Sequence, residues 1–91
     1  MKRNRLDIIH DILIVLKERG NNMKPTHILY KSNLSHKMLK LYLGELMEKE
    51  LVREEAIKDG KKRYSLTPKG FDFLREFSAM KGFIESYGLE E

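Results

Sequence analysis

The sequence predicts a mostly α-helical domain with one small β-hairpin, in the order helix, helix, helix, hairpin, helix. Three observations lead to this prediction. Apolar residues recur at helical spacing, residues that can cap a helix precede these segments, and an Asp-Gly pair separates two short stretches rich in β-formers. Because 91 residues suit one domain, we treat 1–91 as a single domain with a core over 5–66 and a last helix over 68–86.

The first helix is predicted from Arg5 to Arg19, with Asn4 as its cap, Asp7 in its first turn and Gly20 as its end. Its apolar residues form two adjoining faces, which predicts packing on two sides. One face holds Ile9, Leu13 and Leu16, and the other holds Ile8, Ile12 and Val15.

A brief second helix is predicted over residues 26–31, entered through Pro25 and capped by Thr26. Residues 32–34, Ser-Asn-Leu, form a tight connection, because asparagine tolerates the left-handed backbone conformation. The third helix spans residues 35–49, with Ser35 as its cap. Its core-facing stripe repeats at i, i+4 and i+7: Leu39, Leu43 and Leu46.

The hairpin is predicted from "LVREEAI" and "KRYSL", which flank "KDGK". Asp59-Gly60 suits a two-residue type I′ turn, whose two central residues both need positive φ. With that loop, Leu51 and Ile57 share a face with Tyr64 and Leu66. We also expect Tyr30 and Tyr42 to be half-buried.

The fourth helix is predicted to begin at Thr67-Pro68 and to run to about Ser86. Its apolar residues are spaced 4, 3, 4 and 3 apart, as in a heptad seam. We therefore expect a homodimer through this seam, which Ile8 and Ile12 of the first helix would join; the alternative is that the stripe folds back onto the first helix. The seam consists of Phe73, Phe77, Met80, Ile84 and Tyr87.

This order of elements is the plan of a winged helix-turn-helix, in which the third helix enters the major groove of DNA and the hairpin is the wing. The outer face of the third helix is predicted to meet the DNA: Ser35, His36, Lys37, Lys40, Leu41 and Gly44. The wing is predicted to meet phosphates through Lys58, Lys61, Lys62 and Arg63.

Each of these assignments has a plainer alternative. The alternative for Lys37 and Lys40 is that they are solvated lysines, and the alternatives for Leu41 are that it reads bases, faces a partner or is merely exposed. The alternative for the wing cations is that they protect an edge strand from pairing. Near the start of the chain, Lys2, Arg3 and Arg5 form either a basic arm or a frayed terminus.

The charge distribution agrees with a polyanionic partner. The net charge is +4, and residues 1–40 carry nine Lys/Arg against three Asp/Glu, whereas residues 41–91 carry nine against eleven. We expect no enzyme, metal, cofactor or small-molecule ligand, because the chain has no cysteine and its three histidines have no ligand spacing. No apolar run approaches 18 residues, so we expect no membrane partner.

The stretch "KPTHILYKSNLSHKMLKLYLGELMEKELV" together with "RYSLTPKG" resembles the archaeal winged-helix predicted regulators. That group includes small basic chromatin proteins that dimerise through a C-terminal coiled coil. The resemblance covers about Leu6 to Gly70, but the family usually has glycine where this chain has Glu50, and the fourth helix is shorter than in the chromatin members. The matching residues are Thr26-His27-Ile28, Asn33-Leu34-Ser35, Tyr42-Leu43, Tyr64-Ser65-Leu66-Thr67 and Gly70.

Taken with the residues, the resemblance implies a dimeric transcriptional regulator that binds double-stranded DNA. Such a protein would lie in the cytoplasm, associated with the nucleoid. Two alternatives stay open at this point: an architectural or chromatin protein with little sequence preference, and a winged-helix module that binds proteins instead of DNA.

Overall fold

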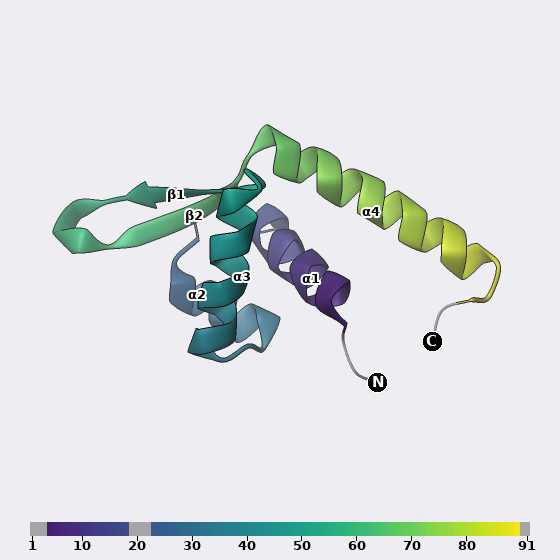
Figure 1. Cartoon of the computed structure of the whole chain (residues 1–91), viewed down its shortest axis with the longest axis horizontal. Coiled ribbons are helices and arrows are strands. Elements are labelled where there is room, and N and C mark those ends of the chain that lie inside the picture. The colour runs from purple at the N-terminus through teal and green to yellow at the C-terminus, as the bar shows by residue number, and fades with distance from the viewer. Residues whose placement is uncertain (1–3, 19–22, 90–91) are drawn as a thin grey trace.

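A computed structural model of the chain describes residues 4–18 and 23–89. It contains four helices and one antiparallel hairpin in the predicted order (Figure 1). These elements are α1 (Arg5–Glu18), α2 (Pro25–Ser32), α3 (His36–Glu48), β1 (Val52–Ala56), a 3-10 turn (Lys58–Gly60), β2 (Lys62–Leu66) and α4 (Pro68–Ser86). The mostly α-helical fold with a wing-like hairpin is therefore confirmed. The predicted end of the first helix at Arg19-Gly20 lies outside the described residues.

The helix starts follow the capping chemistry of the sequence, with one exception. The Asn4 Oδ1 accepts a hydrogen bond of 2.8 Å from the Asp7 N–H, and the Asp7 carboxylate accepts one of 3.3 Å from the Asn4 N–H. Ser35 and Thr67 cap α3 and α4 in the predicted way. Thr26 does not cap α2, because that helix begins one residue earlier, at Pro25, after an N-cap position without a side-chain hydrogen bond.

The turn between α2 and α3 depends on Asn33. This residue has φ 56° and ψ 52°, which is the left-handed conformation that asparagine tolerates. The Leu34 N–H then donates to the Leu29 carbonyl over 3.3 Å, which closes the end of α2. The predicted tight connection is confirmed, and it sets the direction in which α3 leaves.

The hairpin turn has the predicted backbone but not the predicted register. Asp59 and Gly60 both have positive φ, 64° and 70°. However, the Lys61 N–H donates to the Lys58 carbonyl at 3.4 Å, whereas the Lys61 carbonyl accepts from Ile57 at 2.8 Å. Two residues thus oppose one, which is a β-bulge.

The bulge shifts the strand pairing by one residue. Val52 pairs with Leu66 and Glu54 with Tyr64, so Val52 faces the core. The prediction that Leu51 and Ile57 share that face was wrong, because a shift of one residue turns every side chain to the other side of a strand. Met23 adds an isolated bridge to β2, with hydrogen bonds of 2.7 and 2.8 Å to the backbone of Tyr64.

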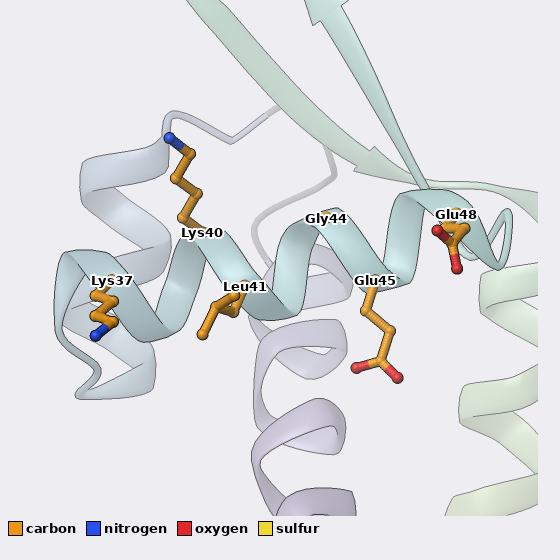
Figure 2. Close-up of a pocket in the computed structure, with 6 residues that line it drawn as sticks. All are labelled: Lys37, Lys40, Leu41, Gly44, Glu45 and Glu48. Carbon is orange, nitrogen blue, oxygen red and sulfur yellow. The ribbon is translucent and has the colours of Figure 1, made fainter.

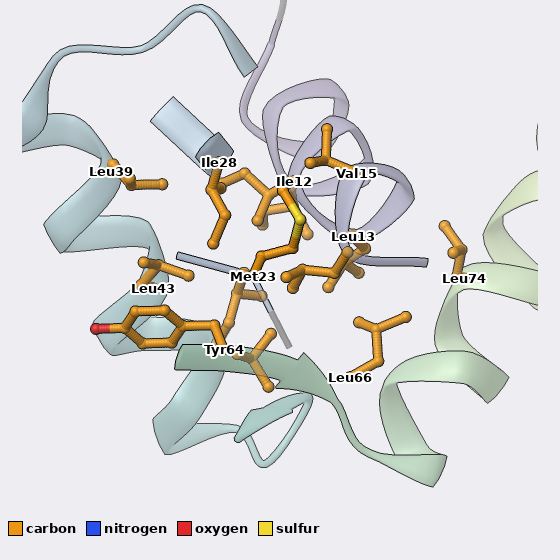
Figure 3. Packing of buried hydrophobic residues seen from close by; sticks show 14 residues of the cluster. Ile12, Leu13, Val15, Met23, Ile28, Leu39, Leu43, Tyr64, Leu66 and Leu74 are labelled. Carbon is orange, nitrogen blue, oxygen red and sulfur yellow. The ribbon is translucent and has the colours of Figure 1, made fainter. Parts of the chain in front are cut away.

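The hydrophobic core lies where α1 meets α2, α3 and the hairpin (Figure 3). The predicted α3 stripe is confirmed, since all three of its leucines are buried. Both apolar faces of α1 are also used: Ile12, Leu13 and Leu16 have no exposed surface, and Val15 has 8%. Both predicted apolar faces of α1 are therefore largely covered within the chain.

The joint between α3, the hairpin and α4 is held by hydrogen bonds of Thr67, through both its hydroxyl and its backbone. The Thr67 hydroxyl accepts a hydrogen bond of 3.0 Å from the Gly70 N–H and donates one of 2.6 Å to the Glu50 carbonyl. The Thr67 N–H donates to the Leu51 carbonyl at 3.1 Å. Glu50, where the resemblance led us to expect glycine, adopts φ 64°, and the Leu51 N–H still reaches the Leu46 carbonyl at 2.9 Å. The third helix thus ends in the usual left-handed manner without glycine.

From this joint, α4 runs over α1 and continues away from the hairpin (Figure 1). The hairpin and α4 extend in opposite directions, which makes the molecule elongated, with principal extents of 50 × 27 × 22 Å. The tip of the hairpin and the far end of α4 therefore lie at opposite ends of the molecule.

Candidate nucleic-acid interface

The outer face of α3 carries the residues that the sequence assigned to it. Lys37, Lys40, Leu41 and Gly44 line one shallow depression on the side away from the core (Figure 2). The Leu41 side chain is 61% exposed. Gly44 has open space where a Cβ would stand, so the helix backbone is accessible there. The structure therefore places these four residues together on one free surface.

Ser35 and His36 stand at the N-terminal end of the same helix, each with a different role. The Ser35 hydroxyl accepts a hydrogen bond of 3.2 Å from the Met38 N–H, so it holds the first turn. His36 lines a groove between α3 and the hairpin, to which Lys40 and Gly44 also contribute. The free N–H groups and positive dipole end at this point favour an anion.

On the hairpin side of the groove, three polar side chains form a small network. The Tyr64 hydroxyl donates a hydrogen bond of 2.9 Å to the Glu54 carboxylate, and the Lys62 ammonium lies 3.6 Å from the same carboxylate oxygen. Burial, and secondarily this hydrogen bond, raises the pKa of Tyr64 to about 12, so the phenol stays protonated. Lys62 is thereby charge-compensated within the protein.

The four predicted wing cations do not form one cluster. Lys58 and Lys61 are exposed at the turn. Lys62 lies on the face that carries Tyr64, whereas Arg63 points to the opposite face of the hairpin and is half-buried. The turn therefore presents two free lysines instead of four cations at its tip.

Sequence reasoning missed the acidic part of this face. Glu45 and Glu48 line the same depression as Lys37 and Leu41. Glu45 forms a two-pronged ion pair with Arg5 at the start of α1. The helical spacing of Glu45 after Leu41 was a usable signal, but a partner 40 residues earlier in the chain has no local signature.

The tyrosine prediction was half right. Tyr42 is half-buried beside the core, as expected. Tyr30 was wrongly assigned, because its side chain is 79% exposed on α2. It occupies the outer side of the helix that precedes the turn.

The predicted seam of α4 divides into two parts. Its first part packs within the chain: the Phe77 ring stacks on His10 of α1 with centroids 5.0 Å apart, and Phe73 lies 5.9 Å from Phe77. Ile12 was predicted to join a dimer interface, and this is wrong, because it has no exposed surface. Ile8 is also partly buried against the core.

The second part of α4 is apolar and uncovered. Beyond Phe77 the helix leaves the core, and every described residue from Ser78 to Leu89 is exposed. The large apolar side chains there include two that the seam prediction did not name, Phe83 and Leu89. The exposed fractions are 49% for Met80, 65% for Phe83, 37% for Ile84, 67% for Tyr87 and 73% for Leu89.

The described ranges hold neither a metal-binding cluster nor a membrane-spanning helix. Across residues 4–18 and 23–89, no three His, Asp or Glu side chains gather closely enough to hold a metal ion. Over the same part of the chain, no helix is long and apolar enough to cross a membrane.

Comparison with known proteins agrees with this architecture. A family model described as "Winged helix-turn-helix" matches residues 2–85. A stretch of 70 residues, 77% of this chain, is 39% identical to the uncharacterized protein MJ0290 of Methanocaldococcus jannaschii, and it covers only 30% of that protein's length.

Solved structures share the fold. The transcription regulator MepR of Staphylococcus aureus matches with a TM-score of 0.78 and 16% identity, over 88% of this chain and 60% of that one. Sso10a-2, a DNA-binding protein from Sulfolobus solfataricus, matches with a TM-score of 0.75 and 21% identity, over 94% of this chain and 90% of that one. F93 from STIV, a winged-helix DNA-binding protein, matches with a TM-score of 0.73 and 25% identity, over 87% of this chain and 90% of that one.

These matches confirm the predicted resemblance to archaeal winged-helix proteins. Most of the matched length is the part that forms α1 to α4 in the structure, including the helix pair and the hairpin. Two of the matched structures, Sso10a-2 and F93, are DNA-binding proteins. The chain therefore belongs to the winged helix-turn-helix family.

Proposed function

We propose that this chain is a transcriptional regulator that binds duplex DNA, with the outer face of α3 in the major groove. The observation that carries the proposal is the outer face of α3, where Lys37 and Lys40 flank exposed Leu41 and bare Gly44. Lysines bind phosphates or guanine acceptors, leucine contacts thymine methyl groups, and glycine permits close approach. Leu41 thus places an apolar contact beside two cations on an accessible surface.

The hairpin supports the same proposal in a secondary role. Lys58 and Lys61 at the turn are free to contact phosphates next to the groove that α3 enters. Lys62 already pairs with Glu54 and would contribute less. The wing cations should therefore add affinity without selecting sequence, and their substitution should weaken binding to all duplexes about equally.

Removal of both α3 lysines tests the proposal. Lys37→Ala with Lys40→Ala should weaken binding more than about tenfold at moderate salt, and the log–log salt slope should flatten by roughly 0.9 per lysine. Electrophoretic mobility shifts over a salt series measure both quantities. Lys17→Ala is the matched control, because Lys17 is exposed on α1 and lines neither groove. Unchanged affinity in a folded double variant would refute DNA binding by this face.

The free part of α4 supports a dimeric assembly. Met80, Phe83 and Ile84 are exposed apolar residues on a helix that extends beyond the core. A second copy of the chain could cover them by pairing the two helices. Two-fold symmetry would then present two α3 helices to one duplex, about 34 Å apart if they occupy successive major grooves.

An architectural or chromatin role is the second candidate, favoured by the scarcity of base-reading side chains on this face. The two cations that line the α3 depression, Lys37 and Lys40, are lysines, which suit phosphates on any sequence. Selection of bound duplexes from a random pool separates the candidates: a sharp motif supports a regulator, and no motif supports an architectural protein. Either role would place the protein at the nucleoid. Failure to bind any duplex would favour the protein-binding alternative.

A further inference from the structure

The acidic end of the α3 face has an organised structure that the proposed phosphate contacts do not explain. Arg5 Nη1 donates a hydrogen bond of 2.7 Å to Glu45 Oε1, and Arg5 Nη2 pairs with the other carboxylate oxygen. This is the fork geometry of a planar guanidinium on a planar carboxylate. It fixes the orientation of the carboxylate, which a single lysine contact would not do.

Glu45 shares its surface with the residues that would meet DNA. It lines the same depression as Lys37 and Leu41, and Figure 2 shows these three side chains along one flank of the helix. The side chain of Glu45 is 31% exposed, so it is only partly covered by Arg5. Eight residues separate Lys37 from Glu45, which corresponds to about 12 Å along the helix, or three to four base pairs.

A carboxylate at that position would ordinarily weaken DNA binding, because phosphates repel it. Arg5 compensates the charge, and its hydrogen bonds and charge hold the pKa of Glu45 below its usual value, so the group stays ionised. Each carboxylate oxygen keeps a second lone pair after binding the guanidinium. In the major groove, the donor that acidic side chains characteristically accept from is the amino group of cytosine N4.

We infer that Glu45, oriented by Arg5, is a specificity-determining residue that accepts a hydrogen bond from a cytosine amino group in the major groove. This inference rests on the proposed DNA binding by α3 and assigns a base-reading role to a residue beyond its basic patch. Arg5 is then a positioning residue, which acts on the DNA only through Glu45. The cytosine should lie three to four base pairs from the position nearest Lys37, by the helical rise given above.

Glu45→Gln tests the inference directly. Duplexes selected by the wild type should contain one cytosine per half-site, and Glu45→Gln should replace that preference with adenine, which glutamine reads through N6 and N7. The cytosine preference should fall at least about fivefold, the equivalent of a contact worth ~1 kcal/mol. Selection from a random duplex pool, followed by competition binding, measures both changes.

Glu48→Gln is the matched control. Glu48 lines the same depression and is exposed, and among the described residues no arginine orients it. Its substitution removes the same charge, so it should raise affinity for all duplexes about equally and leave base preference unchanged. If Glu45→Gln behaves in that uniform way, Glu45 contributes charge only and the inference is overturned.

Arg5→Lys tests the positioning role. It keeps the positive charge but loses the fork, so overall affinity should stay within about twofold while the cytosine preference weakens. An unchanged preference would exclude positioning by Arg5. A wild-type protein that binds no DNA would refute the proposed function itself, whereas DNA binding without a cytosine preference at this position would refute only the role of Glu45.

Discussion

At the scale of single residues, Gly70 shows how the absence of a side chain sets the position of a whole helix. A Cβ added there would overlap the carbonyl oxygen of Leu51 and crowd the Leu66 side chain. Gly70 is buried and lies in the first turn of α4, where its N–H also meets Thr67. Only glycine allows the backbone of α4 to come this close to the end of α3.

We therefore expect Gly70→Ala to be strongly destabilising. The clash is with backbone, which cannot move aside as a flexible side chain does, so the cost should reach about 3 kcal/mol or more. Thermal unfolding should show a loss in Tm of about 12 to 24 °C, at about 4 to 8 °C per kcal/mol for a domain of this size.

Gly82 provides the control for that substitution. It lies in the same helix with nothing within 4 Å of an added Cβ. Gly82→Ala should leave stability unchanged or raise it by up to about 1 kcal/mol, as alanine favours helix. Equal behaviour of the two variants would contradict a close approach at Gly70.

Single residues with local chemistry were predictable, and those with distant partners were not. Asn4, Ser35 and Thr67 were assigned as caps from the sequence, because a cap bonds only two or three residues ahead. Arg5 and Glu45 meet only because the ends of two helices come together. The pairing therefore required the tertiary structure.

At the scale of elements, the hairpin shows the limit of pattern reasoning. Leu51 and Val52 are adjacent apolar residues, so the sequence of β1 fits either register. The bulge at the turn decides between them by adding one residue to the first strand. Asp59-Gly60 correctly predicted the turn geometry but carried no information about the bulge next to it.

The packing of α1 against α4 should depend on pH through His10. Its ring stacks on Phe77 and lies near Ser78 and Lys81 of α4, as well as Asp7 and Asp11 of its own helix. Burial, and then the charge of Lys81, lowers the pKa of His10 in the folded state. The unfolded chain then binds the proton more readily than the folded one.

Stability should consequently be greatest above the unfolded pKa of about 6.5 and should fall as pH drops from there toward the lower folded pKa. His10→Gln should remove this contribution and flatten the dependence of unfolding free energy on pH between 7.5 and 5. Urea denaturation at several pH values measures this pH dependence of the unfolding free energy. The same slope in the variant and the wild type would show that other groups cause any pH dependence.

At the scale of the whole molecule, the proposed dimer is the largest consequence of the structure. The seam was predicted as one continuous interface, but Phe73 and Phe77 pack on α1 within the chain. A heptad pattern cannot distinguish these two uses, because an apolar stripe is the same whether its partner is in the chain or in another copy.

We expect Ile84→Asp to convert a homodimer into a monomer, since burying an unpaired carboxylate in an apolar seam is strongly unfavourable. DNA binding should also weaken by about tenfold or more through lost bivalency. Ile84 is partly exposed in the single chain, so the variant should still fold. Sedimentation and mobility shifts measure the two effects.

Gly82→Asp is the matched control, because residues two apart on a helix do not share a face. It introduces the same charge with nothing within 4 Å and should leave the dimer intact. A wild type that sediments as a monomer at micromolar concentration would rule out the seam as an interface between copies.

The close approach of α4 to the end of α3 also has a mechanical consequence. Helix α4 is anchored at its start by Thr67 and Gly70, and its 19 residues extend about 28 Å from there. A tilt of α4 by about 10° at this anchor would displace the far end of the helix by about 5 Å. In the proposed dimer, a small tilt at the joint would therefore become a large change in the distance between the two α3 helices, and so in the spacing of the DNA half-sites that the pair could span.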